Sequence, residues 1–214
     1  WYAQMFDSRA IMSALSTTLL IAFASALIAT IIGTAAAISI HAMKPIPRTV
    51  IMGITNIPML NADIVTGISL MLAFVAFGIS LGFKTVLISH ITFNIPYVIL
   101  SVMPKLKQTD KSTYEAALDL GASPIYAFIK VIFPDIMPGV LSGFLLALTM
   151  SLDDFIITHF TKGAGINTLS TLIYSEVRRG IRPSMYALST IIFLTVLILL
   201  LIVNFRSFKK ADKN

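Results

Sequence analysis

The sequence predicts an all-α, polytopic membrane protein, and three observations support this fold class. Hydrophobic residues make up 57% of the 214 residues and charged residues only 12%, whereas soluble chains contain about 25% charged residues. Uncharged stretches near the length that a spanning helix needs, about 20 residues, recur along the chain. Runs such as TIIFLTVLILLLIV are continuously apolar, without the polar alternation that strands of a membrane β-barrel show.

Five membrane-spanning helices are expected, all within one transmembrane domain that covers residues 1–214. The runs between charged residues are 10–40, 49–83, 85–104, 136–152 and 183–205. Asp63 is the one charge that interrupts the second run.

Lys and Arg set the expected orientation, because cytoplasmic loops carry an excess of basic residues. Ten basic residues fall on the side of the 104–135 loop and the C-terminus, and six on the other side. The loop and the C-terminus are therefore expected in the cytoplasm, with Trp1 outside and a further span upstream of it. The net charge of +6 is then a topology signal. No aromatic-rich basic patch indicates nucleic-acid binding.

The 104–135 loop is expected to fold into two short helices. Ser112 and Glu115 have the spacing of a capping box, which predicts a helix starting near Thr113. Gly121 is suited to the left-handed conformation that ends a helix. Downstream, the Ser-Pro pair at 123–124 is typical of a second helix start.

One face of the first short helix combines small and apolar side chains at helical spacing, which would permit close approach of another protein. An ordinary amphipathic connector on the membrane surface fits the periodicity equally well. The residues on this face are Tyr114, Ala117, Leu118 and Gly121.

The spacing of residues in this loop resembles the EAA loop of ABC-importer permeases. The matching positions are Glu115, Ala116, Ala117, Gly121, Val131, Phe133 and Pro134. In that family the loop is a coupling helix that docks on a cytoplasmic ATPase dimer and transmits its closure to the membrane spans. The resemblance implies a transport subunit that is no enzyme, with ATP and Mg bound by the partner ATPase. Accordingly, GISLGFKT departs from the phosphate-binding loop pattern, so no cofactor is expected in this chain.

Three carboxylates are candidates for a site within the membrane, where an unpaired charge costs at least about 2.5–3.5 kcal/mol. At about 1.5 Å per residue, Asp63 and Asp153 are expected about 21 and 22 Å above the cytoplasmic entry of their spans. Together with Asp154, and with no Lys or Arg in either span, they would create a negative potential suited to a polycation. Two alternatives remain open. Asp153 and Asp154 could solvate a helix end at the interface, and Asp63 could mark a buried polar helix break near Pro58 and Asn61.

Longer segments resemble the second permease of spermidine/putrescine ABC importers, the PotC type. They include ADIVTGISLM, FKTVLISHITFNIPYVI and LTMSLDDFIITHFTKG. The resemblance implies a bacterial inner-membrane subunit that imports polyamines, with a homologous second permease, an ATPase dimer and an extracellular or periplasmic binding protein as partners. It also implies substrate-binding roles for Trp1, Asp63, Ser151, Asp153 and Asp154.

The sequence also bears on other functions, namely a protease, a metal site and other kinds of transporter. Adjacent Asp153 and Asp154, taken as neighbours on one helix, point about 100° apart and cannot form the dyad of an aspartyl protease. The dispersed residues His41, His90 and His159 are expected to be helix-end or packing histidines, so no metal site is expected. An ABC importer for ferric ion, an amino acid or an anion is the alternative within the family. A proton-coupled transporter is the alternative outside it.

Overall fold

The computed structural model describes residues 8–179, 186, 189–190 and 193–194, and within these ranges every regular element is a helix. The helices are α2 (Arg9–Ala42), α3 (Pro45–Leu60), α4 (Asp63–Ala76), α5 (Phe83–Gln108), α6 (Lys111–Asp119), α7 (Pro124–Ala127), the π-helical turn η1 (Phe128–Ile132), α8 (Phe133–Asp153), α9 (Ile156–Thr161) and α10 (Leu169–Arg179). The expected span at 183–205 and the predicted site residue Trp1 lie outside the part of the chain that can be described.

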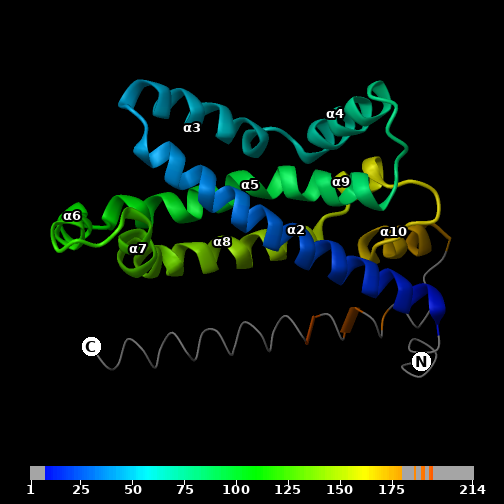
Figure 1. Cartoon of the computed structure of the whole chain (residues 1–214). Helices are drawn as coiled ribbons and strands as arrows, with labels where there is room; N and C mark the ends of the chain where they lie inside the picture. The colour runs from blue at the N-terminus through cyan, green and yellow to red at the C-terminus, as the bar shows by residue number, and fades with distance from the viewer. Residues whose placement is uncertain (1–7, 180–185, 187–188, 191–192, 195–214) are drawn as a thin grey trace.

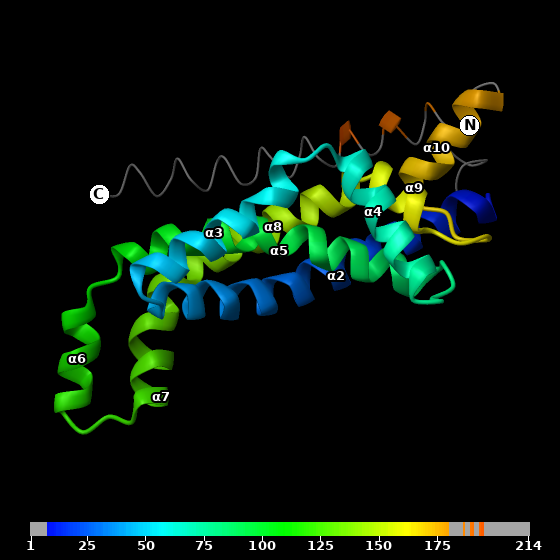
Figure 2. The same ribbon diagram turned by 90° about the horizontal axis from the view of Figure 1, so that it is seen from above.

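Three long helices, α2, α5 and α8, form the centre of the structure (Figure 1). Three described helical segments, Arg9–Ala42, Phe83–Gln108 and Pro124–Asp153, are long and apolar enough to cross a membrane. The short helices α6 and α7 project from one end of this bundle, and α4, α9 and α10 lie at the other (Figure 2). We call these the α6 end and the α9 end.

Small residues allow the long helices to approach closely. They recur every fourth position along α2 at Ser25, Ala29, Gly33 and Ala37, and along α8 at Gly139, Gly143, Ala147 and Ser151, and all are buried. A Cβ on Gly33 would stand 2.8 Å from Val98 Cβ of α5, and one on Gly139 would stand 2.9 Å from the Ser101 carbonyl oxygen. Because lipid tails are as apolar as Leu side chains, close van der Waals packing of this kind drives association of membrane helices.

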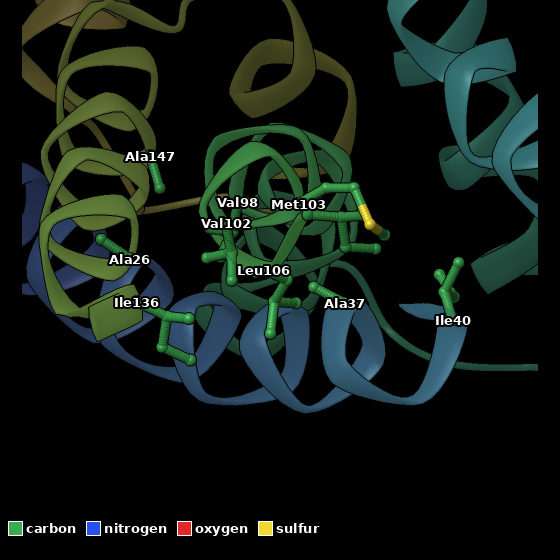
Figure 3. Close-up of a cluster of buried hydrophobic side chains, with 10 residues drawn as sticks. Ala26, Ala37, Ile40, Val98, Val102, Met103, Leu106, Ile136 and Ala147 are labelled. Carbon is green, nitrogen blue, oxygen red and sulfur yellow. The ribbon is translucent and has the colours of Figure 1, made fainter. Parts of the chain in front are cut away.

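Between α2, α5 and α8 lies a core of buried hydrophobic side chains (Figure 3). Val98, Val102 and Leu106 of α5 face Ala37 of α2 and Ile136 of α8. This core extends toward the α6 end, so the 104–135 loop continues directly from a well-packed part of the bundle.

The second expected span is not one straight helix. Residues 49–83 form most of α3 and all of α4, whose axes meet at 103°. Pro58, inside α3, cannot donate a backbone hydrogen bond, and Asn61 and Ala62 have extended conformations. The predicted break near Pro58 and Asn61 is therefore present, although Asn61 and Asp63 are exposed and not buried.

Candidate functional site

The paired aspartates do not lie on one helix, so the expectation of a 100° separation was wrong. α8 ends at Asp153, and Asp154 has an extended backbone with φ −63° and ψ 125°. After Phe155, the short helix α9 begins at Ile156. We call residues 153–155 the α8–α9 junction.

Asp154 caps α9 from this junction. Its Oδ1 accepts a hydrogen bond from Ile157 N–H at 3.1 Å, and its Oδ2 accepts from Thr158 N–H and from the Thr158 hydroxyl, both at 2.8 Å. A carboxylate in this position satisfies backbone groups that a helix start leaves without partners, and it is favoured by the helix dipole. The six residues of α9 are too few to form a stable helix alone.

A buried hydrogen-bonded chain holds Asp154 in place. His90 of α5 bonds Ser151 through Nδ1 at 2.5 Å and Thr158 through Nε2 at 2.9 Å. Its Nε2 also lies 3.4 Å from Asp154 Oδ2. Ser151 Oγ in turn lies 3.1 Å from Ser25 Oγ of α2. We call these five residues the His90 network. It joins α2, α5, α8 and α9.

The donors of the His90 network can be assigned. Because the Thr158 hydroxyl proton goes to Asp154, the Thr158 oxygen accepts from His90, which places an N–H on Nε2. His90 is only 3% exposed. The expectation of a packing histidine is therefore met, but the sequence did not indicate its three polar neighbours, Ser151, Asp154 and Thr158.

Asp153 differs sharply from its neighbours. The side chains of Ser151 and Asp154 are buried within the His90 network, 4% and 8% exposed respectively. Asp153 is exposed, and no hydrogen bond or ion pair ties it to another described residue. Of the three polar positions predicted near 151–154, Asp153 alone presents its charge at the surface of this chain.

Asp63 occupies the first turn of α4, whose N-cap residue, Ala62, offers no side-chain hydrogen bond. The negative charge is therefore placed at the positive end of the helix dipole. Asp63 is exposed and, like Asp153, has no ion-pair partner among the described residues.

The packing of α4 on α9 brings the two acidic regions to the same end of the bundle (Figure 1). A Cβ on Gly67 would stand 3.2 Å from Phe160 Cδ2 and 3.4 Å from Ile157 Cα. Gly67 is one turn beyond Asp63 on the same face of α4, and α9 follows Asp153 after two residues. Through this contact, the helix that carries Asp63 lies against the helix that follows Asp153.

The 104–135 loop at the α6 end agrees in part with its prediction. Gly121 has φ +87° and ends α6 with backbone bonds from Gly121 N–H to Leu118 and from Ala122 N–H to Ala117, the pattern of a Schellman motif. Ser123 caps α7 by accepting from Tyr126 N–H at 3.3 Å.

The predicted capping box was wrong, because α6 begins at Lys111 with Asp110 as its N-cap. Asp110 Oδ1 accepts a hydrogen bond from Ser112 N–H at 2.9 Å, and this bond lowers the pKa of the carboxyl group. Ser112 is consequently inside the first turn and cannot be the cap.

The face of α6 expected to meet another protein is partly occupied within the chain. Tyr114, Ala117 and Leu118 are half-buried, and α6 packs on α7 and η1. Glu115 and Ala116 are exposed, as is Leu120, with 89% of its surface accessible. Pro134, in the first turn of α8, is exposed as well.

Comparison with a protein family gives a match over residues 29–210 to the binding-protein-dependent transport system inner membrane component. The spermidine/putrescine transport system permease protein PotC of Haemophilus influenzae is 37% identical over 202 residues, covering 94% of this chain and 79% of that protein. The putrescine transport system permease protein PotI of Escherichia coli K12 is 38% identical over 199 residues, covering 90% and 71%.

Two solved structures are similar in fold. A chain of the MetNI methionine ABC transporter, in inward-facing conformations, superposes with a TM-score of 0.70 at 21% identity, covering 91% of this chain and 94% of that one. A chain of an amino acid ABC transporter gives a TM-score of 0.65 at 19% identity, covering 92% and 90%. These comparisons confirm the predicted fold class and family resemblance.

Proposed function

Because this chain belongs to the family of binding-protein-dependent transport system inner membrane components, we propose that it is a permease subunit of an ATP-driven polyamine importer. Relatives 36–38% identical over most of the chain are named spermidine/putrescine or putrescine permeases. The charge of the candidate site agrees with a polycationic substrate.

The single observation that carries the proposal is the pair of exposed carboxylates at the α9 end. Asp63 and Asp153 are exposed. Asp63 begins α4, which packs on α9, and Asp153 ends α8 two residues before α9 begins. A carboxylate without a basic partner in the membrane is costly unless it faces water or a cation. Two such groups create a potential that attracts ammonium groups and repels anions.

The structure supports different roles for the predicted site residues. Asp63 and Asp153 contact the polyamine, whereas Asp154 and Ser151 hold the α8–α9 junction that presents Asp153. Trp1, which lies outside the described residues, keeps its predicted substrate-binding role.

Three partners complete the importer. A homologous second permease closes the translocation path, because the exposed carboxylates of this chain line only one side of it. A cytoplasmic ATPase dimer binds the coupling loop through Glu115, Ala116, Ala117, Gly121 and Pro134. A binding protein delivers polyamine at the α9 end, which faces outward from the bacterial inner membrane, and the C-terminus lies in the cytoplasm.

ATP-dependent uptake of labelled spermidine by vesicles containing the complete importer tests this proposal. Asp63→Asn and Asp153→Asn are expected to reduce uptake at least about tenfold, since each removes a charge that binds the substrate. Glu115→Gln is the comparison at the α6 end, and it is expected to impair coupling while leaving the preference for spermidine over putrescine unchanged. Normal uptake by both aspartate variants in assembled importers would refute the carboxylate site.

A further inference from the structure

A pocket of about 360 Å³ between α9 and α10 is rich in positive charge. The residues that line it are His159, Lys162, Thr171, Tyr174, Ser175 and Arg178. This α9–α10 pocket combines two cations, a histidine and three hydroxyl groups, and no carboxylate is among its lining residues. It repels a polyamine and is therefore distinct from the site formed by the exposed aspartates.

The basic groups of the pocket are held in defined positions. The Arg178 guanidinium carbon lies 5.6 Å from the centre of the Tyr174 ring, a cation–π contact, and the Tyr174 ring lies 4.6 Å from that of Phe155. Lys162 Nζ donates to Asn167 Oδ1 at 2.8 Å. Partial burial lowers the pKa of Lys162, because its ammonium group loses hydration without gaining a negative partner. An anion in the pocket would supply that partner.

The pocket is lined by residues of α9 and α10 and by Lys162, which follows α9, and these helices lie at the end of the bundle opposite α6 and α7 (Figure 2). Leu169 and Leu172 of α10 pack on Ile11 and Ala14 in the first turns of α2. With 34 residues, α2 is about 51 Å long and exceeds a hydrocarbon core of about 30 Å. A pocket beside its first turns therefore lies near the membrane surface, where a delivered substrate enters.

We infer that the α9–α10 pocket receives an acidic side chain of the polyamine-binding protein when that protein docks on the outer face; this inference rests on the proposed function. The family depends on a binding protein that delivers substrate to the outer face, and a carboxylate on the docking face of that protein would supply the negative charge that the pocket lacks. Arg178 can pair with a carboxylate through two parallel N–H···O bonds.

The α9–α10 pocket, where the binding protein docks in this inference, lies close to the candidate substrate site. His159 belongs to α9 and Lys162 directly follows it. Asp154 caps the same helix. A carboxylate drawn into the pocket therefore fixes the binding protein beside the α8–α9 junction, where Asp153 is exposed.

The test measures ATPase stimulation of the complete importer by increasing concentrations of spermidine-loaded binding protein, in nanodiscs of phosphatidylcholine alone. Arg178→Gln and Lys162→Gln are expected to raise the half-maximal concentration about tenfold each, with the rate at saturation within about twofold of wild type. The wild-type half-maximal concentration is expected to rise with salt, and less steeply in the variants, because the lost contact is ionic.

Lys84→Gln is the matched control. Lys84 is exposed in the first turn of α5 at the α9 end, so the substitution removes the same charge from the same end but outside the pocket. It is expected to shift the half-maximal concentration by less than about twofold. Arg178→Lys keeps the charge and is expected to retain most of the affinity.

The outcomes separate this inference from the proposed function. Equal shifts in Lys84→Gln and Arg178→Gln would overturn the pocket in favour of a diffuse surface charge. Normal docking by both pocket variants would also overturn the role of the pocket, but it would not contradict the proposed function in polyamine import. A defect that appears only when phosphatidylglycerol is added would assign the pocket to a lipid headgroup. A wild-type importer that responds to no polyamine would refute the proposed function itself.

Discussion

The α3–α4 break and the α8–α9 junction both interrupt an apolar segment beside an acidic residue, but they are built in opposite ways. At the junction, Asp154 accepts three hydrogen bonds from α9 and is held by His90 from another helix. At the break, Asp63 begins α4 without a side-chain cap, and none of the residues of α3 is buried. One interruption is closed by buried polar contacts, and the other leaves its charge exposed.

The difference shows that an acidic residue at a helix interruption has two separable uses. A carboxylate that satisfies backbone N–H groups stabilises the protein and has little capacity left for a ligand. An exposed carboxylate with no partner keeps its capacity for a cation, whether it begins a helix, as Asp63 does, or ends one, as Asp153 does. By this criterion Asp154 belongs to the first class, whereas Asp63 and Asp153 belong to the second.

His90→Ala should produce the largest effect, because it removes the centre of the His90 network and leaves Asp154 and Ser151 short of a buried partner. The free energy of unfolding in detergent, followed by far-UV circular dichroism, is expected to fall by about 2–3 kcal/mol. Thr92→Ala is the control on the same helix, since Thr92 is exposed and bonds only the Ile88 carbonyl within α5. If both variants lose the same stability, the network does not support the junction.

Gly67→Val should lower the free energy of unfolding by less than His90→Ala, because it disturbs only the packing of α4 on α9. Its side chain would collide with Phe160 and Ile157, forcing α4 away from α9 at a cost of about 1–3 kcal/mol. Spermidine uptake by the assembled importer is expected to fall about tenfold.

Gly53→Val is the control for Gly67→Val, because a Cβ on Gly53 meets nothing within 4 Å. The two glycines lie inside α3 and α4 respectively, so the intrinsic change in helix propensity is shared. Uptake with Gly53→Val should remain close to wild type. Equal losses in the two variants would contradict a specific role for α4–α9 packing.

Acidification should have the smallest effect, and it should act at the α6 end. The Ser112 N–H lowers the pKa of Asp110 below its unfolded value, so this cap contributes stability above about pH 4. The contribution is lost as the pH falls through the native pKa. Amide exchange in α6, corrected for its intrinsic pH dependence, should therefore accelerate at low pH. Asp110→Asn, which caps without titrating, should lack this pH dependence; persistence of the acceleration would exclude Asp110 as its source.

Local patterns predicted the parts of the structure that local physics determines. Gly121 ends α6 with a positive φ and Ser123 caps α7, because both depend on conformational preferences of adjacent residues. The spacing from Ser112 to Glu115 was misleading, because Asp110 provides an acceptor one position before the helix begins.

Contacts between distant segments could not be predicted in the same way. Ser25, His90 and Ser151 come from three separate helices, and no spacing in the sequence specifies which of them meet. The available signal was the presence of polar residues at Ser25, His90 and Ser151 within apolar runs, which indicates inward-facing positions but not partners. The exposure of Asp153 beside the buried Asp154 likewise depends on where α8 ends.

Under the proposed function, Asp153 faces the polyamine path and Asp154 does not. This difference is tested most directly by single cysteines in this chain, which has no native cysteine. Asp153→Cys and Asp154→Cys importers are treated with a cationic thiol reagent, with and without spermidine, and labelling of this chain is followed by mass spectrometry. Labelling at position 153 is expected to be rapid and to be slowed by spermidine, whereas labelling at position 154 is expected to be slow. Rapid, spermidine-protected labelling at position 154 with an unreactive position 153 would contradict this expectation.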